Sequence, residues 1–244
     1  GCCFADLDLK QQGVIEDFQL LFYIIQPPTP ERVKYDIFDR VNRGGTPLNK
    51  QEMRNALYRG RCTRMLDKLC CSPEFLIATG RSINKERMKD QYVVLRAMAF
   101  LMLHRGEFKD IPALQYRGDI DDFLARFMVY VNDNAPEKLI VDYENLFIRC
   151  MQISYDLLGE NGFRFSGNGI RRPINMPLFE ALSYLFSFVP EKIDYTWASR
   201  LILDIESVKE EFDDSRYFSG NIDSTTSVSF RFDRMDKIIN RIQL

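Results

Sequence analysis

Apolar residues recur every three or four positions along most of the chain after residue 30, and this spacing places them on one face of an α-helix. Polar links separate the stripes, and no stretch repeats at a fixed period. Eight or nine helices of this kind predict a mainly α, multi-helix assembly. The expected helices cover residues 31–41, 49–57, 62–69, 88–103, 121–130, 139–157, 178–188, 197–208 and 235–242.

Two helix starts carry additional local signals. Thr29-Pro30-Glu31 is typical of an N-cap followed by proline in the first turn, and that helix should stop within 42–45. Asn49 with Glu52 three residues later resembles a capping box, so a second helix should begin there.

One segment differs from the helical pattern. Phe18 to Ile25 (FQLLFYII) is a continuous apolar and aromatic run that ends at Gln26-Pro27-Pro28, and it is the only strong strand candidate. Because a lone strand cannot pair its own backbone groups, we expect its partner strands upstream of residue 1. A soft boundary near residue 80 separates this strand-bearing part from the remaining helices.

Composition is that of an ordinary globular protein, with 45% hydrophobic and 28% charged residues among 244. The longest apolar run, Ala97 to Leu103, is far shorter than the roughly 18–20 residues of a membrane span, and nothing marks the chain for secretion. We therefore expect no membrane association and a cytoplasmic location.

Charge is unevenly distributed although the net value is only −2. Residues 31–90 hold fourteen Lys/Arg against eight Asp/Glu, a local +6, whereas residues 191–214 hold three against eight, a local −5. The asymmetry favours a basic face for an anionic partner such as DNA or a nucleotide only weakly, because a solvated surface is the commoner explanation for either cluster.

The six cysteines and single histidine argue against a metal centre. No pair has C-x-x-C spacing, and adjacent cysteines such as Cys70 and Cys71 rarely bridge. On one helix Cys62 would lie about 12 Å from Cys70, too far for a disulfide. We expect buried thiols, no metal ligands and no catalytic residues. His104, at the end of an apolar helix, is expected to interact with the helix dipole at that C-terminus.

The segment from Tyr35 to Gly60 (YDIFDRVNRGGTPLNKQEMRNALYRG) is the most informative stretch. It resembles the F-x-R-x-N-x-G-G-x-x-L-x-x-Q-E-x-R-N signature of a domain-of-unknown-function family found in GmrSD-type type IV restriction systems. The matching residues are Phe38, Arg40, Asn42, Gly44, Gly45, Leu48, Gln51, Glu52, Arg54 and Asn55.

Later stretches support the same resemblance. Arg87, Met88 and Asp90, followed by Leu95-Arg96, resemble an R-M-x-D and L-R element of the family. The loop from Phe163 to Asn175 resembles its basic loop. The resemblance implies that residues 1–80 are the C-terminal remnant of a ParB/sulfiredoxin-like α/β domain with one strand, and that 81–244 form a helical domain.

The family's catalytic D-G-x-Q-R motif is missing from these residues, and one histidine cannot supply the HNH nuclease found in many relatives. The resemblance thus implies a non-catalytic part of a protein that, at full length, is an NTP-dependent endonuclease component with a nucleotide as cofactor. The partner it implies is the upstream domain of the same chain. No cofactor is expected for these residues alone.

A glycine turn is the first candidate binding site. Paired glycines before a helix N-terminus can aim N–H groups at a phosphate, and flanking arginines can grip its oxygens. A second candidate is the basic loop of Arg164, Arg171 and Arg172. The alternatives are a tight helix-to-helix turn, surface ion pairs, including one between Arg87 and Asp90, and a helical scaffold without a ligand. The glycine-turn residues are Arg40, Asn42, Arg43, Gly44, Gly45 and Arg54.

Overall fold

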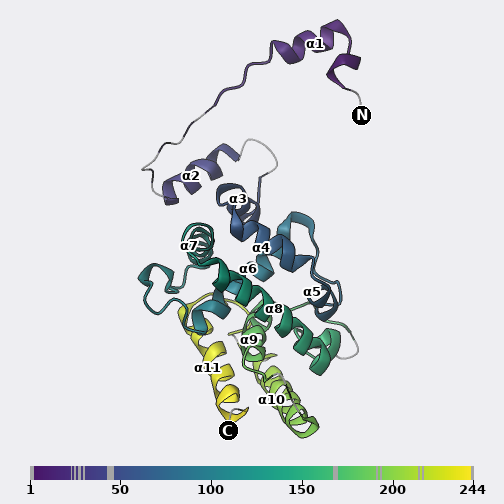
Figure 1. Cartoon of the computed structure of the whole chain (residues 1–244), viewed down its shortest axis with the longest axis vertical. Coiled ribbons are helices and arrows are strands. Elements are labelled where there is room, and N and C mark those ends of the chain that lie inside the picture. Colours follow the sequence, from purple (N-terminus) through teal and green to yellow (C-terminus); the bar gives the residue numbers. More distant parts are fainter. Residues whose placement is uncertain are drawn as a thin grey trace. The chain divides into compact units, whose positions relative to one another are not determined.

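A computed structural model of the chain describes residues 3–22, 24, 26, 29, 31–42, 47–166, 170–190, 192, 194–213, 215 and 217–242. The chain divides into two compact units, Gly1–Thr46 and Pro47–Leu244. Helices account for all the regular structure of the described residues, and these contain no strand. The predicted mainly α fold is confirmed (Figure 1).

The described residues of the first unit form two α-helices. A 3-10 turn, η1 (Phe4–Asp6), precedes α1 (Leu9–Glu16), and α2 (Glu31–Asn42) follows a long connection. Helix α2 begins and ends where the sequence indicates. Helix α1 was not predicted, because its interior glycine and weak apolar periodicity resemble a polar loop.

The predicted strand is wrong for the described residues of its segment. Residues 18–22 and 24 form no strand, and Leu21 and Ile24 are 77% and 81% exposed. A strand forms only with a neighbour to accept and donate its hydrogen bonds, and none of the described residues supplies one.

The second unit holds nine α-helices and three 3-10 turns within the described ranges (Figure 1). The α-helices are α3 (Lys50–Leu57), α4 (Arg61–Cys70), α5 (Pro73–Ala78), α6 (Lys89–His104), α7 (Ile120–Asp133), α8 (Glu137–Leu158), α9 (Met176–Phe186), α10 (Tyr195–Asp213) and α11 (Thr225–Ile242). The turns are η2 (Glu86–Met88), η3 (Pro112–Leu114) and η4 (Gly159–Asn161). Helix α5 is too short to show a periodic stripe and was not predicted.

Side-chain caps set several helix starts. Asn49 accepts hydrogen bonds from the backbone N–H groups of Gln51 and Glu52, and Glu52 accepts one from the N–H of Asn49, as the predicted capping box requires. Asn175 caps α9 by accepting from the N–H of Leu178. Each cap pairs backbone donors that the first turn of a helix leaves free.

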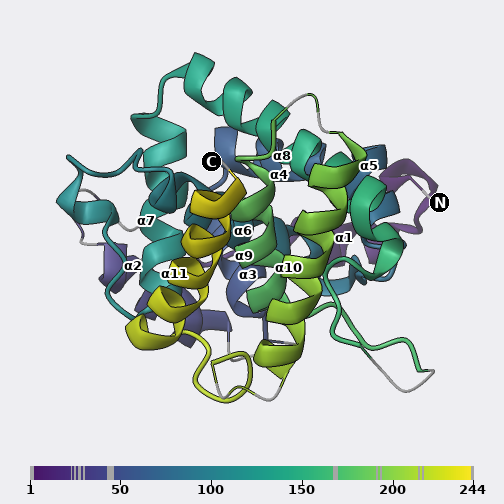
Figure 2. The ribbon, with the colours of Figure 1, turned by 90° about the horizontal axis from the view of Figure 1, so that it is seen from below.

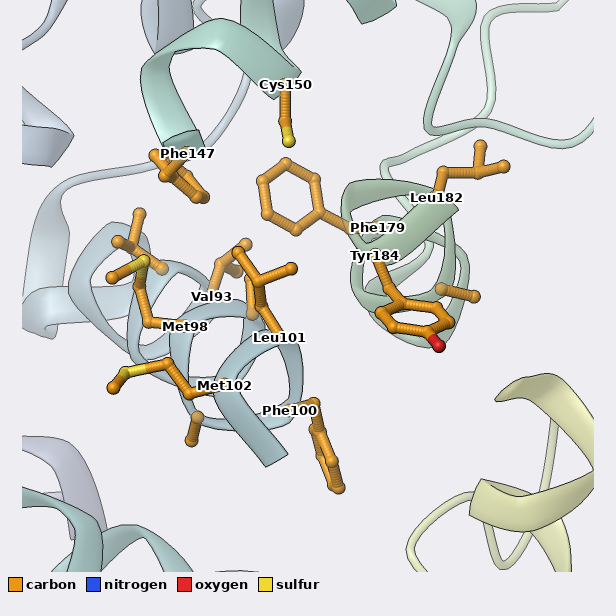
Figure 3. Close-up of a cluster of buried hydrophobic side chains, with 14 of the residues drawn as sticks. Val93, Met98, Phe100, Leu101, Met102, Phe147, Cys150, Phe179, Leu182 and Tyr184 are labelled. Carbon is orange, nitrogen blue, oxygen red and sulfur yellow. The ribbon is translucent and has the colours of Figure 1, made fainter. Parts of the chain in front are cut away.

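Helix α6 is the centre of the second unit and contacts α4, α7, α8 and α9. Its residues 93–102 are all buried, so the helix is buried on every side rather than on one face. Figure 3 shows Phe179 of α9 reaching between α8 and α6, close to Phe147, Cys150 and Leu101. Rings and sulfur-containing side chains interdigitate here without polar partners, as in a close-packed core.

Helices α9, α10 and α11 lie side by side (Figure 2), and α11 contacts both of the others. Helix α10 also contacts α8. The acidic residues of α10 therefore come close to the loop that follows α8, which carries the basic residues described below. No described helix is long and apolar enough to cross a membrane.

The second compact unit begins at residue 47, within the part of the chain that the resemblance assigns to a ParB-like remnant. Helices α3, α4 and α5 contact the later helices, with α5 packed on α8 and α4 on α6. The assignment of residues 1–80 to a ParB-like remnant remains a prediction.

Candidate anion-binding pocket

The predicted phosphate site at the glycine turn lies partly outside the described residues, which do not include Arg43, Gly44 and Gly45. Asn42 is the last residue of α2, and Arg40 is exposed on the same helix in the first unit. Arg54 belongs to the second unit. The glycine-turn site as a whole therefore stays a prediction.

The start of α3 is not open to an anion. The N–H groups of Gln51 and Glu52, in the first turn of the helix, donate to the Asn49 side chain. The Glu52 carboxylate lies beside them. Arg87 donates to this carboxylate at 2.9 Å and holds the pKa of Glu52 below its usual value. A phosphate here would meet the negative charge of Glu52, and the N–H groups of Gln51 and Glu52 are already paired.

Arg54 is also not a surface ligand, which corrects its predicted role. Its side chain is 1% exposed and pairs with Asp121 at 2.9 Å, and its guanidinium lies 5.3 Å from the Tyr92 ring centroid. The helical position of Arg54 turns it toward α7 and α6 rather than toward the turn before α3. Arg54 therefore joins three helices inside the unit.

Arg87 does not pair with Asp90, the partner that helical spacing suggested. Its side chain donates to the Pro47 carbonyl oxygen at 2.7 Å and to Glu52, while its own carbonyl accepts from Asn49 at 2.7 Å. Both Arg87 and Met88 have positive φ, so the backbone is not helical there and the i, i+3 spacing does not apply. Arg87 fastens the loop before α6 to the start of α3.

The structure also contains a network of buried ion pairs that was not predicted from the sequence. Glu180 of α9 is fully buried and pairs with Arg96 of α6 and with Arg231 of α11, the latter at 3.2 Å. Arg96 also pairs with Asp223 at 2.6 Å. A buried carboxylate shared by two guanidinium groups fixes the relative positions of three helices, a structural rather than a catalytic role.

His104 does not act as a charged partner of the α6 C-terminus, which corrects the expectation that it does. Its ring stacks on Phe232 with centroids 3.6 Å apart, and its Nε2 atom is buried without a hydrogen-bond partner. Burial, with a smaller contribution from Arg231, lowers the pKa of His104 to about 3. The imidazole is neutral near pH 7 and belongs to the aromatic core.

The basic loop forms one side of a pocket of about 660 Å³, which we call the basic pocket. The opposite side comes from α10. Its lining residues are Glu160, Asn161, Arg164, Phe165, Ser166, Ile170, Arg171, Arg172, Glu206 and Lys209. Four cationic and two anionic side chains give this lining a net charge of +2. All three arginines of the predicted basic loop thus lie around one hollow.

Arg164 is the least exposed residue of the lining, at 4%. Its guanidinium donates to the carbonyl oxygens of Glu160 at 3.1 Å and Thr79 at 3.0 Å, and also to the Arg172 carbonyl and the Ser82 hydroxyl. All four acceptors are neutral. No carboxylate therefore pairs with this buried positive charge among its hydrogen-bond partners.

The pKa of Arg164 is lowered, first by burial and then by repulsion from Arg171, while Glu160 acts in the opposite direction. Two positive charges are therefore held near each other at the floor of the basic pocket. An anion in the pocket would reduce this repulsion.

The other three cations are partly compensated by acids. Arg171 pairs with Glu160 at 2.7 Å, and Lys209 pairs with Glu206 at 2.9 Å. Arg172 pairs with Asp213, the last residue of α10. The locally acidic segment thus neutralises part of the basic loop, a pairing that charge counts along the sequence could not reveal.

Gly80 provides space for the Arg171–Glu160 pair. Its φ is +58°, and a Cβ atom there would lie 2.0 Å from the Arg171 Nη2 atom and 2.6 Å from a Glu160 carboxylate oxygen. A larger residue there would strain the left-handed backbone and push aside the ends of both side chains. The glycine after α5 therefore helps to position a pocket arginine.

Among the described residues, no group of three or more His, Cys, Asp or Glu side chains is arranged to hold a metal ion. Cys62, Cys70 and Cys150 are buried free thiols, as predicted, whereas Cys3 and Cys71 are exposed, so the prediction is wrong for these two. The chemistry available at the basic pocket is therefore charge-assisted hydrogen bonding to an anion.

Comparisons with protein-family models, with curated proteins and with solved structures give no match for this chain.

Proposed function

We propose that this chain is the non-catalytic helical portion of a GmrSD-like bacterial defence protein, acting in the cytoplasm. In this proposal it binds a phosphate group of DNA or of a nucleotide in the basic pocket. The motif between Phe38 and Asn55 supports the family, and the pocket supports the ligand class. The other partner proposed is a domain upstream in the same chain.

The observation that carries the binding proposal is the environment of Arg164. A buried guanidinium bonded only to neutral oxygens, with Arg171 nearby, keeps a positive charge that has no hydrogen-bonded carboxylate next to a hollow. Buried charges are normally paired. A phosphate would provide the missing negative charge together with acceptor oxygens.

A helical scaffold without a ligand is the second candidate function. It is favoured by the acid partners of Arg171, Arg172 and Lys209, which leave no pocket side chain among the three unpaired. In a scaffold these pairs would only join the basic loop to η4 and α10. The two candidate functions differ in whether replacing Arg171 and Arg172 weakens the binding of a phosphate ligand.

The test is fluorescence anisotropy with a labelled single-stranded oligonucleotide over a range of salt concentrations. The variant Arg171→Ala/Arg172→Ala removes one exposed and one half-buried cation from the pocket, and Arg64→Ala/Arg117→Ala removes two exposed cations that do not line it. We expect only the pocket variant to bind weakly. Its slope of log K against log salt should fall by about 1.4, because two fewer phosphate charges are neutralised.

Both variants should fold, since exposed ion pairs contribute only about 0–1 kcal/mol each. Circular dichroism and the urea midpoint check this. Equal binding and equal salt slopes for the wild type and the pocket variant would support the scaffold instead.

A further inference from the structure

We infer that the basic pocket selects a terminal phosphate monoester, as carried by a nucleotide or by the 5′ end of a nucleic-acid strand, over the phosphodiester backbone. This inference rests on the proposed function and names its substrate class. It follows from how the pocket cations are already paired and from the shape of the site.

The two kinds of phosphate differ in how well they can displace a carboxylate from a pocket cation. Glu160, Glu206 and Asp213 each place one negative charge on a pocket cation. A backbone phosphodiester also carries one negative charge, so displacing a carboxylate with it gains little. A terminal phosphate carries about −1.5 to −2 near pH 7 and three strong acceptor oxygens, so it can outcompete a carboxylate and engage two cations together.

The carboxylates can be displaced at small cost. The side chains of Glu160 and Asp213 are 53% and 32% exposed, and that of Glu206 is 40% exposed. Each can turn toward water when an anion takes its place. Lys209, by contrast, is 5% exposed and is held by the Asn161 carbonyl oxygen at 3.4 Å as well, so it remains in the lining.

Donor geometry favours a phosphate with several free oxygens. Arg171 and Arg172 are adjacent and reach the pocket from the basic loop, whereas Lys209 comes from α10. Guanidinium groups donate in pairs, and an ammonium group donates in any direction. Three such groups around one hollow match a terminal phosphate, whose three oxygens are free of a second ester bond.

The size of the hollow agrees with this selection. At about 660 Å³ it is within the range of roughly 300–1,000 Å³ typical of small-molecule sites. A strand backbone instead needs an open groove along which successive phosphates lie. The basic pocket can take the end of a strand, or a whole nucleotide, more readily than a continuous backbone.

The test compares two 3′-labelled single-stranded oligonucleotides of identical sequence, one with a 5′-phosphate and one with a 5′-hydroxyl group. Anisotropy at low salt should show binding about tenfold tighter for the phosphorylated strand. Adenosine 5′-monophosphate should compete with the phosphorylated strand, whereas adenosine should not. If the nucleotide fails to compete although the strand preference holds, the ligand is a strand end rather than a free nucleotide.

A change in pH gives a second readout. Lowering the pH from about 7.5 to about 5.5 converts most of the terminal phosphate to its monoanion, so that strand should bind about fourfold more weakly. The hydroxyl strand should not change. The charged groups that face the ligand are Arg164, Arg171, Arg172, Lys209, Glu160, Glu206 and Asp213, and the described lining contains no histidine to titrate in this range.

The variants assign the effect to the pocket. In Arg171→Ala/Arg172→Ala the preference for the 5′-phosphate should disappear, and in Arg64→Ala/Arg117→Ala it should persist. Equal affinity for both strands, lost in the pocket variant, would overturn the monoester inference and leave the proposed function standing. Absence of binding to either strand, or binding that the pocket variant leaves unchanged, would overturn both.

Discussion

Arg54 was predicted to contact a ligand, but its position on helix α3 places it in the core of the second unit. Its guanidinium is buried against Asp121 and Tyr92, so replacing it with methionine keeps the volume and removes the charge pair. Asp121 keeps Lys50 as a partner and is partly exposed, which limits the loss. We expect Arg54→Met to lower the free energy of unfolding by roughly 2–3 kcal/mol.

Urea denaturation measures this change, and Arg64→Met on the exposed side of α4 is the matched control. The control should stay within about 0.5 kcal/mol of the wild type. If both substitutions cost equally little, Arg54 is a surface group as the sequence suggested.

His104 gives the folded protein a dependence on pH in the acid range. Its folded pKa is lowered to about 3, below the ordinary value of about 6.5 that it regains on unfolding. The unfolded chain therefore binds a proton first, and stability is lost as the pH falls from about 6.5 toward 3. At pH 5 the loss from this residue should be roughly 2 kcal/mol relative to pH 7.

His104→Phe should remove this component while preserving the stack on Phe232. The measurement is the difference in unfolding free energy between wild type and variant at each pH, in which contributions from carboxylates cancel. A difference that stays constant between pH 5 and pH 7 would show that His104 titrates normally in the folded protein.

At the scale of single elements, strained backbone conformations occur at the end of helix α5. Helix α5 is followed by Gly80 and Arg81 in left-handed conformations, with φ of 58° and 51°. The N–H of Arg81 donates to the Leu76 carbonyl oxygen at 2.8 Å, and its side chain is exposed. Glycine needs no Cβ there, so Arg81→Gly should stabilise the protein by about 0.5–1 kcal/mol.

An Arg→Gly substitution inside a helix should instead lower the stability of the protein. Arg64→Gly in α4 should cost about 1 kcal/mol, since glycine is a poor helix former. Thermal unfolding of the two variants beside the wild type distinguishes these effects. A lower melting temperature for Arg81→Gly would mean that the arginine side chain stabilises this end of α5.

Element positions were predictable where one face is apolar and a cap marks the start. The helices that contain Met53, Leu66 and Phe147 follow their stripes closely. The misses have local causes: α5 is too short for a period, and a run of β-formers such as 18–25 makes a strand only if another strand pairs with it.

At the scale of the whole molecule, charges buried between helices hold the second unit together. Arg96 and Glu180 each interrupt a long apolar run, VVLRAMAFLML and MPLFEALSYLF, and that pattern could have indicated a buried pair. Which helices meet through it could not be predicted, because Asp223 and Arg231 join the network from far along the chain.

Removing the shared carboxylate should be costly. Glu180→Ala leaves Arg231 without an acid partner and Arg96 with only Asp223, so we expect a loss of about 3–5 kcal/mol in unfolding free energy. Glu210→Ala, at an exposed site on α10, is the control and should change stability little. A loss below about 1 kcal/mol for Glu180→Ala would mean that packing alone fixes these helices.

The candidate site was predictable only in part, for reasons of distance along the chain. The clustering of Arg164, Arg171 and Arg172 in one loop is local and was predicted. The acids of α10 that complete the pocket, and the inward turn of Arg54, depend on tertiary packing that spacing does not encode.

The most direct test of the account is the response of arginine side-chain signals to phosphate. In 1H–15N spectra of the labelled protein, titration with inorganic phosphate at low salt should shift the Nε–H signals of Arg171 and Arg172, assigned by single Arg→Lys variants. Signals of the buried Arg54, Arg96 and Arg231 should not move. Shifts confined to other arginines, or none at Arg171 and Arg172 at saturating phosphate, would contradict an anion site in the basic pocket.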